Sequence, residues 1–237
     1  MDDTTMDGVA GSIPEREWLP SVWPFVREHL PAAPSPVLEI GCGPSGGFVP
    51  ALEGAGYLAV GVDPEAPEGS AYRRTEFERY EVAEPVDAII ACTSLHHVAE
   101  LEGVVNKICA ALATSGVLIV VEWAWERFDE DTANWCFDRL PGTGGEHDWL
   151  RHHRDEWRAS RAPWGSYLHR WARDHRLHSG QDVILGLENR FDTQLLTTGT
   201  YVFPELAGTT ALDEQAAIDA GQIQATGIRY VGSLRSA

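Results

Sequence analysis

Three glycines in the stretch VLEIGCGPSGG, residues 37–47, have the spacing of a ligand-binding turn. Gly41, Gly43 and Gly46 satisfy the pattern G-x-G-x-x-G directly after an apolar run that is typical of a buried strand. Glycines let the backbone approach a ligand closely, and free amides at the following helix start can meet its polar groups. The pattern alone leaves open a dinucleotide, another adenosine ligand, or a tight turn without a ligand.

Two carboxylates narrow that choice. Glu39 lies two residues before Gly41, inside the end of the predicted strand. A carboxylate there would repel a pyrophosphate, but it suits the ammonium and sulfonium groups of S-adenosylmethionine, directly or through water. Asp63 ends the next apolar run, 22 residues after Gly41, where a carboxylate can accept hydrogen bonds from both ribose hydroxyls. Asp63 therefore predicts an adenosine ligand, and Glu39 favours S-adenosylmethionine.

A histidine pair follows a further apolar run, Val86–Cys92. His96 and His97 are predicted at the carboxyl end of that strand, facing the same site. Methyl transfer is an in-line displacement in which positioning does most of the work, and a neutral imidazole suits the remaining need for a proton acceptor. We expect His97, before His96, as a general base; alternatively, one ring packs under the cofactor and caps the helix near Val98.

Alternating strands and helices must position these residues. Apolar runs predict strands at 37–41, 57–63, 86–92 and 117–123, with a weaker one at 71–80 and later ones at 191–203 and 223–231. Helical spacing predicts helices at 14–30, 46–56, 98–112 and 211–220. Buried strands alternating with helices predict an α/β fold with a doubly wound, mostly parallel sheet.

Four segments together resemble a known family. LEIGCGPSGG, VGVDP, VDAIIACTSLHHV and GVLIVVEW stand in the order of the signature segments of class I S-adenosylmethionine-dependent methyltransferases of the small-molecule-modifying bacterial type. The resemblance covers residues 37–123 and, more loosely, 191–233. It implies S-adenosylmethionine as the cofactor and a seven-stranded sheet whose last strand runs antiparallel.

The resemblance also implies which residues contact the cofactor. Glu39 would lie near the methionine amino group, Asp63 would hold the ribose, and Phe77 with Glu78 would contact the adenine. The full implied set is Glu39, Gly41, Cys42, Gly43, Asp63, Pro64, Phe77, Glu78, Cys92 and Thr93. Ser45 stands where the family has a third glycine, which indicates a shifted turn.

The composition changes after Trp123. Residues 123–178 carry seven of the nine Trp and six of the nine His, in segments of helical pattern that are too polar to cover a sheet. We expect a disordered tail at 1–13, a methyltransferase core at 14–125 and 190–237, and a helical substrate cap at 126–189, inserted after the fifth strand. The candidate acceptor contacts are Trp123, Trp125, Trp149, Trp164 and Tyr167.

Two uses of this aromatic region are open. It could exclude water and fit a planar or apolar acceptor. Alternatively, Trp123 and Trp125 could embrace a cationic amine together with Glu122. A metal site is not predicted: CTSLHH has no carboxylate, and a set of cap residues matches no recognised spacing, namely His147, Asp148, His152, His153 and Glu156.

The net charge and the cysteines indicate which binding partners and which cellular compartment to expect. The 36 acidic and 18 basic residues give a net charge of −18, so binding of nucleic acid is not predicted. No run approaches the roughly 18 apolar residues of a membrane span. Four scattered cysteines without a C-x-x-C pair indicate free thiols and a cytoplasmic protein: Cys42, Cys92, Cys109 and Cys136.

The combined prediction is a metal-independent methyltransferase that acts on O, N or C of a small organic acceptor, with secondary metabolism as its suggested setting. Two alternatives stay open. An NAD-dependent oxidoreductase is disfavoured by Glu39 and by the single lysine, Lys107, which leaves no catalytic Tyr/Lys pair. A non-catalytic nucleotide-binding protein could keep the same fold.

Overall fold

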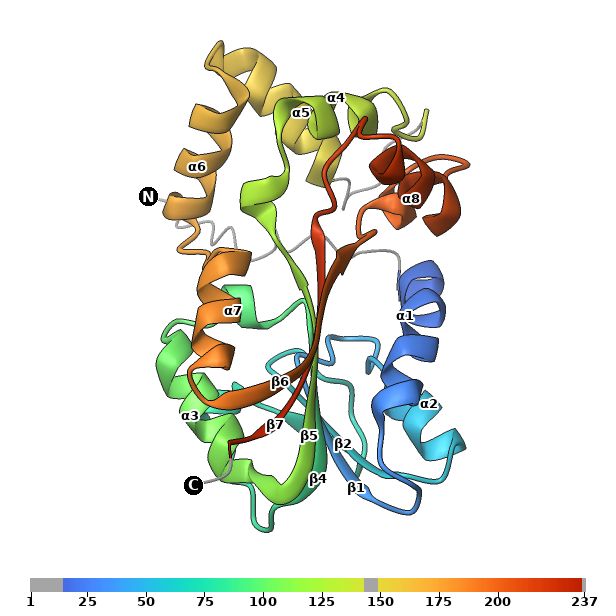
Figure 1. The fold of residues 1–237 in the computed structure, drawn as a ribbon, viewed down its shortest axis with the longest axis vertical. Coiled ribbons are helices and arrows are strands. Elements are labelled where there is room, and N and C mark those ends of the chain that lie inside the picture. The colour runs from blue at the N-terminus through green and yellow to red at the C-terminus, as the bar shows by residue number, and fades with distance from the viewer. Residues whose placement is uncertain (1–14, 143–148, 236–237) are drawn as a thin grey trace.

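A seven-stranded sheet forms the centre of the computed structural model, which describes residues 15–142 and 149–235 (Figure 1). Its order is β3-β2-β1-β4-β5-β7-β6. The strands are β1 Pro36–Ile40, β2 Leu58–Asp63, β3 Tyr72–Arg74, β4 Val86–Cys92, β5 Leu112–Trp123, β6 Phe191–Gly199 and β7 Gly227–Leu234. The pairs from β3 to β5 are parallel, and β7 runs antiparallel to both β5 and β6. The predicted doubly wound sheet with an antiparallel last strand is confirmed.

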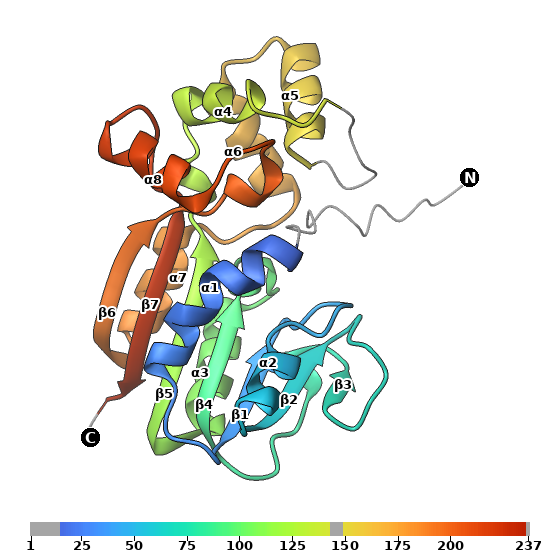
Figure 2. The ribbon, with the colours of Figure 1, turned by 90° about the vertical axis from the view of Figure 1, so that its right-hand side faces the viewer.

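Helices cover both faces of the sheet, as buried parallel strands require. Helices α1 (Glu15–His29) and α2 (Val49–Gly54) lie on one face, and α3 (Leu101–Ala111) and α7 (Gly180–Glu188) on the other (Figures 1 and 2). Each face has its own core cluster of buried apolar side chains. None of the described helices is long and apolar enough to cross a membrane.

A second group of helices stands beyond the carboxyl ends of the parallel strands. It comprises α4 (Glu130–Phe137), α5 (Trp149–Ser160) and α6 (Trp164–Asp174), joined there by α8 (Ala211–Asp219) from near the C-terminus (Figure 2). Helix α7 belongs to the predicted cap at 126–189, yet it lies against α3 on the sheet. The division of the chain into core and cap stays a prediction, and the predicted tail at 1–13 lies outside the described residues.

Local differences from the predicted elements have backbone causes. Helix α2 begins at Val49 rather than at 46, because Gly46 and Gly47 have φ values of 89° and 56°, outside the right-handed helical region. The weak strand predicted at 71–80 is reduced to Tyr72–Arg74, and Phe77–Arg79 forms a 3₁₀ turn, η1. The predicted adenine contacts Phe77 and Glu78 thus lie on a turn beside the sheet edge.

Candidate active site

The glycine turn joins β1 to α2 in a conformation that needs glycine. Gly41 and Gly43 have φ values of 78° and 64°. A Cβ atom at Gly41 would lie 2.5 Å from Cβ of Ser94, and one at Gly47 would lie 2.3 Å from Oε1 of Glu39. The turn is therefore packed against the segment after β4 on one side and against a carboxylate on the other. Side chains at these positions would collide with Ser94 and Glu39.

Glu39 is buried beneath this turn and holds it in place. Both carboxylate oxygens accept from the backbone N–H of Phe48, at 3.0 and 2.8 Å. This hydrogen bond links the end of β1 to the start of α2. Ser45, at the position of the family's third glycine, is exposed on the outer side of the turn. Contact between Glu39 and a cofactor stays a prediction.

Asp63 ends β2 at the same edge of the sheet. Its Oδ1 accepts from the N–H of Glu65 at 2.7 Å, and among the described residues its Oδ2 has no hydrogen-bond partner. Asp63 is half-buried, and Pro64 after it is exposed. The geometry leaves one carboxylate oxygen available to a ligand hydroxyl.

The predicted adenine contacts occupy different environments. Phe77 is buried in the core cluster under α3, and Nζ of Lys107 lies 5.5 Å from its ring centroid. Glu78 is exposed, and its backbone carbonyl accepts from Nζ of Lys107 at 2.8 Å. Lys107 thus ties the η1 turn to α3. The adenine contacts themselves stay a prediction.

The carboxyl end of β4 turns sharply into the histidine segment. Burial raises the pKa of the Cys92 thiol well above its ordinary value, and the nearby carboxylates Glu39 and Glu122 add to this, so the thiol stays protonated. Thr93 has a φ of 52°, a left-handed conformation that costs a non-glycine residue about 1 kcal/mol or more. Its N–H donates to the carbonyl of Val121 at 2.8 Å. This bond directs the next segment toward β5. That segment is the 3₁₀ turn η2, Leu95–His97.

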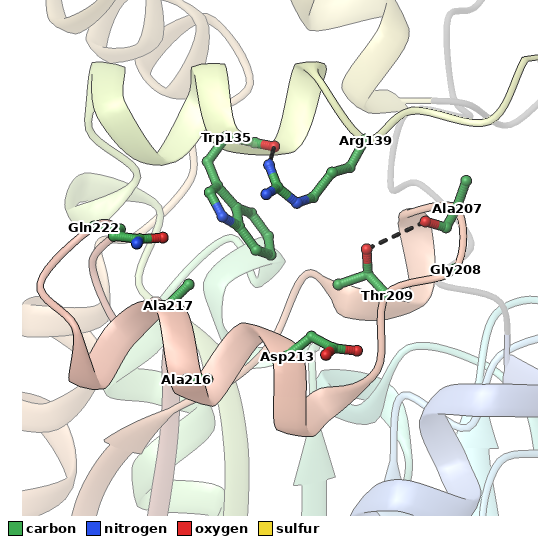
Figure 3. Close-up of a pocket in the computed structure, with 9 residues that line it drawn as sticks. All are labelled: Trp135, Arg139, Ala207, Gly208, Thr209, Asp213, Ala216, Ala217 and Gln222. Carbon is green, nitrogen blue, oxygen red and sulfur yellow. Dashed lines mark hydrogen bonds between the residues drawn. The ribbon is translucent and has the colours of Figure 1, made fainter.

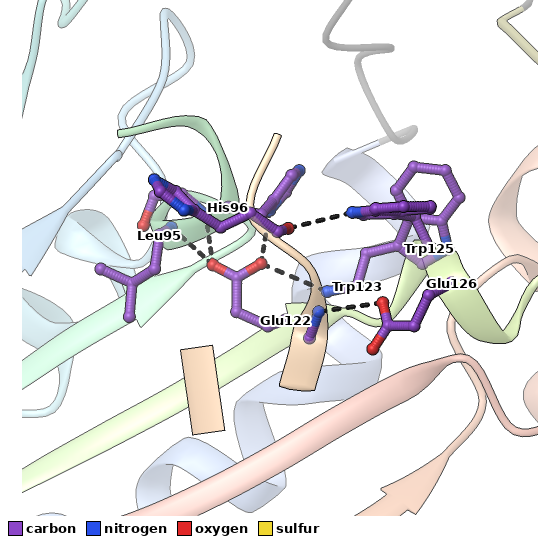
Figure 4. Close-up of polar contacts among 9 residues, drawn as sticks. Leu95, His96, Glu122, Trp123, Trp125 and Glu126 are labelled. Carbon is purple, nitrogen blue, oxygen red and sulfur yellow. Dashed lines mark hydrogen bonds and ion pairs between the residues drawn. The ribbon is translucent and has the colours of Figure 1, made fainter. Parts of the chain in front are cut away.

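Glu122 on β5, predicted only as a partner of Trp123 and Trp125 around a cationic amine, is the centre of a hydrogen-bond network. It is fully buried, at 0% exposure. Its Oε1 accepts from the N–H groups of Ser94 and Leu95, at 2.9 and 2.6 Å. Its Oε2 lies 3.2 Å from the Trp123 N–H and 2.5 Å from Nδ1 of His96 (Figure 4). An acid inside the apolar run VLIVVEW is the sequence signal for it, since a buried carboxylate needs such partners.

The two histidines of the predicted catalytic pair differ in their surroundings. His96 is 4% exposed and is fixed by Glu122. His97 is exposed at the surface, and its ring centroid lies 4.0 Å from that of His96. Partial burial of the His97 ring, together with His96 and His175, lowers its pKa, so His97 is neutral near pH 7. The structure therefore orients His96 rather than His97.

The loop before α7 fastens this histidine segment. The N–H of His178 donates to the carbonyl of His96 at 3.0 Å, and its ring Nε2 lies 2.9 Å from the carbonyl of Val98. Nε1 of Trp125 donates to the carbonyl of His178 at 3.0 Å. Glu126 accepts from the first two N–H groups of α7, both at 2.9 Å (Figure 4). Trp125 and Glu126 thus anchor the loop that closes over η2.

Four of the five predicted acceptor contacts gather in one aromatic cluster. Trp123 is buried at its centre, stacked on Tyr201 at 6.2 Å and 8° and edge-on to Trp149 at 5.2 Å. Trp164 is buried, and its Nε1 donates to the carbonyl of Phe128 at 2.6 Å. Tyr167 is also buried in this cluster. Trp125 lies at the margin, edge-on to His169.

Tyr167 connects the cluster to the polar side of α5. Its hydroxyl donates to Glu156 at 3.0 Å and lies 2.8 Å from Nδ1 of His153. His152 and Glu156 approach to 3.3 Å. His147 and Asp148 lie outside the described residues. Within the part of the chain that the structure describes, no group of three or more His, Cys, Asp or Glu side chains is arranged to hold a metal ion.

A separate cavity of about 470 Å³ lies between α4 and α8 (Figure 3). The guanidinium of Arg139 covers the ring of Trp135 there at 4.1 Å. The lining contains none of the predicted site residues; it consists of Trp135, Arg139, Ala207, Gly208, Thr209, Asp213, Ala216, Ala217 and Gln222.

Comparisons with known proteins agree with this fold. The profile of the family described as "Methyltransferase domain" matches residues 16–162, more than half of the chain. The 2-ketoarginine methyltransferase of Streptomyces arginensis is 34% identical over 119 residues, which cover 42% of this chain and 35% of that protein. The chain thus matches about a third of the length of this curated relative.

Solved structures share the fold at low identity. One is the N-methyltransferase NodS from Bradyrhizobium japonicum WM9 in complex with S-adenosyl-L-homocysteine, with a TM-score of 0.55 and 14% identity, covering 96% of this chain and 95% of that chain. Another is geranyl diphosphate C-methyltransferase from Streptomyces coelicolor A3(2), with a TM-score of 0.54 and 12% identity, covering 91% and 79%.

Proposed function

Since the chain belongs to the family of methyltransferase domains and uses S-adenosylmethionine, we propose that it methylates a small organic acceptor bound beside Trp123. The observation that carries this proposal is a continuous path of contacts at one end of the sheet. The glycine turn packs on Ser94 at Gly41, and the ring of His96, two residues later, lies 6.4 Å from that of Trp123. A cofactor on the turn and an acceptor beside Trp123 would meet at this histidine.

The residues of the turn suit the cofactor. S-adenosylmethionine supplies a methyl group on a positively charged sulfur, so the acceptor needs little activation. We propose that Oδ2 of Asp63 accepts the ribose hydroxyls. Glu39 acts through its negative charge and through the turn that it holds, because both of its oxygens already accept from Phe48. The remaining proposed contacts are Gly41, Cys42, Gly43, Pro64, Phe77, Glu78, Cys92 and Thr93.

Of the two uses of the aromatic region, contact with a planar or apolar acceptor is the better supported. Glu122 is surrounded by hydrogen-bond donors, and Trp125 is tied to His178, so neither is placed to enclose a cationic amine. Trp123 carries a buried Nε1–H with no acceptor among the described residues, which costs about 1–3 kcal/mol. Its Nε1 is closed to the outside, so Trp123 offers the acceptor an apolar ring surface and no hydrogen bond.

The other cap residues would shape the site by packing. Trp164 is enclosed by aromatic neighbours and hydrogen-bonded to Phe128, so we propose that it supports Tyr167 rather than touching the acceptor. Transfer without a metal ion is proposed because CTSLHH brings no carboxylate to the strand end and Glu122 is already engaged. The curated relative's small acceptor supports a small molecule here, and secondary metabolism is a suggested setting.

Calorimetry with S-adenosylhomocysteine tests the cofactor site. We expect binding in the micromolar range for the wild type, and for Asp63→Ala an affinity at least about tenfold weaker, since hydrogen bonds to a charged group contribute about 1.5–3 kcal/mol. Asp192→Ala removes an exposed acid of β6 at the far edge of the sheet and serves as the charge control. Equal affinities in wild type and Asp63→Ala would refute the proposed site.

A second measurement identifies the acceptor. Formation of S-adenosylhomocysteine is followed with a panel of small acceptors that begins with 2-ketoarginine and includes phenols, amines and 2-oxo acids. Turnover of at least one compound is expected. Turnover of a nucleic acid or a protein in its place would contradict the small-molecule proposal.

A further inference from the structure

We propose that His96, oriented by Glu122, accepts the proton that the methyl acceptor loses. This inference rests on the proposed function and adds the proton path to it. It implies an acceptor whose nucleophilic atom carries a proton, such as a hydroxyl, an N–H group or an acidic C–H.

The contacts of Glu122 determine which nitrogen of His96 carries the hydrogen. The backbone N–H groups of Ser94, Leu95 and Trp123 can only donate, so both carboxylate oxygens act as acceptors. Nδ1 of His96, at 2.5 Å from Oε2, then bears the hydrogen of their shared bond. The second ring nitrogen, Nε2, keeps its lone pair. This is the protonation state that a general base requires.

Nε2 of His96 is also available. Among the described residues it has no hydrogen-bond partner, yet it is not one of the buried side-chain atoms that lack one, so it retains access to the outside. The ring lies between the glycine turn, through Ser94, and the edge of Trp123. In the proposed arrangement this lone pair serves the acceptor held beside Trp123.

His97 lacks the first of these properties, a fixed tautomer. None of the described residues forms a hydrogen bond to its ring, so nothing fixes its tautomer. Its lowered pKa makes it a weaker base than an ordinary histidine. The positive charge that develops on a proton-accepting imidazole would face the carboxylate of Glu122 only at His96.

The step balances without another reactant. The acceptor atom forms its bond to the methyl carbon while the bond from that carbon to sulfur breaks, and the electron pair of the broken bond stays on sulfur. The proton of the acceptor atom moves to Nε2 of His96. The imidazolium then releases it to solvent, and Glu122 stays unprotonated throughout. Glu122 is therefore a positioning residue, and His96 is the catalytic one.

Replacing Glu122 by Gln should reverse the tautomer of His96. The Gln amide oxygen must accept from Ser94 and Leu95, because an NH₂ group there would face two donors. The NH₂ group then faces Nδ1 of His96, which must become the acceptor. The hydrogen moves to Nε2, and the lone pair directed at the acceptor is lost.

Nitrogen-15 NMR of histidine-labelled protein with bound S-adenosylhomocysteine reads this tautomer without an acceptor. We expect the Nδ1–H form of His96 in the wild type and the Nε2–H form in Glu122→Gln. Glu214→Gln is the matched control, because Glu214 is equally buried and also accepts from three backbone N–H groups. It should leave the signals of His96 unchanged. An Nε2–H form in the wild type, or no change in Glu122→Gln, would overturn the proposal.

Kinetics with a compound from the acceptor panel test the proton transfer itself. His96→Asn keeps an amide donor for Glu122 but has no base, so kcat should fall about 100- to 10,000-fold, the usual contribution of a general base. The affinity for S-adenosylhomocysteine should stay within about threefold. An unchanged kcat would defeat the dyad alone, whereas absent S-adenosylhomocysteine binding in the wild type would defeat the proposed function.

Discussion

Glu122 and Glu214 are two buried carboxylates with nearly the same surroundings and different consequences. Both have 0% exposure, and each accepts from three backbone N–H groups. Glu122 has in addition one titratable partner, His96, whereas among the described residues the hydrogen bonds of Glu214 come from the backbone of Tyr201, Val202 and Phe203 alone. Backbone amide donors thus stabilise a buried carboxylate, and a titratable side-chain partner lets that carboxylate influence a proton transfer.

The two acids support different parts of the site. Glu214, on α8, holds the segment that carries Tyr201, and the Tyr201 ring stacks on Trp123. Its role is to position the Tyr201 ring against the aromatic cluster. Glu122 holds the η2 turn and directs the ring of His96. Aromatic packing tolerates small displacements, but a proton transfer depends on distances near those of a hydrogen bond.

The largest expected effect is a difference in kcat between the Gln variants of the two acids. Glu122→Gln should lower kcat about 100- to 10,000-fold, because His96 loses its lone pair toward the acceptor. Glu214→Gln should keep kcat within about tenfold of the wild type, since it changes no group that exchanges protons. Both are measured as S-adenosylhomocysteine formation per folded molecule, with folding checked by circular dichroism. Equal losses would mean that both acids are purely structural.

Removal of Glu214 should affect the free energy of unfolding rather than kcat. Glu214→Ala leaves the amides of Tyr201, Val202 and Phe203 without an acceptor, so the free energy of unfolding should fall by about 3 kcal/mol. Urea unfolding at pH 7.5 measures this, with the exposed acid Asp174 changed to Ala as the control. A loss no larger than that of the control would show that solvent replaces Glu214 at no cost.

A third buried acid, Glu39, extends the comparison to the cofactor. Gly47→Ala places a Cβ against Glu39 in a left-handed residue, whereas Gly208→Ala meets open space at a similar φ of 60°. Both variants carry the backbone strain of about 1 kcal/mol. Only Gly47→Ala should weaken S-adenosylhomocysteine binding, by about tenfold or more, which corresponds to about 1.4 kcal/mol. Calorimetry that finds both variants equally impaired would refute a specific role of the Glu39 contact.

The smallest expected effect is a dependence of stability on pH. Burial raises the pKa of Glu214 above its ordinary value of 4.5, and its amide hydrogen bonds oppose this only in part. Between the ordinary and the raised value the folded state binds more protons than the unfolded state. The contribution of Glu214 to the free energy of unfolding is therefore largest below the ordinary value and falls as the pH rises to the raised value.

Glu214→Gln should remove this dependence. Its cost in the free energy of unfolding, measured in urea, should be larger at pH 4 than at pH 8. The same comparison on Asp174→Ala provides the baseline. A cost that rises with pH would mean that Glu214 is stabilised in its charged form.

The sequence predicts the cofactor half of the molecule well. Apolar period is a local property, so the mostly parallel sheet follows from it. The antiparallel last strand and the S-adenosylmethionine-dependent class are implied by the family resemblance, and all three are confirmed. The individual cofactor contacts stay predictions, as do a cytoplasmic location and the lack of a nucleic-acid partner.

The proton-accepting pair could not be predicted in the same way. Glu122 and His96 are 26 residues apart and meet only because Cys92 pairs with Val121 across two neighbouring strands. The preference for His97 considered position alone, without the partner that fixes a tautomer. Likewise, the role of Tyr201 depends on a stack between distant segments, which periodicity does not encode.

The hydrogen bonds from His178 place a constraint on the order of synthesis. The carbonyls of His96 and Val98 can form these bonds only after His178 has been synthesised, about 80 residues later in the chain. A nascent chain that has completed β5 already contains the glycine turn, Asp63 and both partners of the Glu122–His96 pair, but not the loop that ties down the carbonyls of η2.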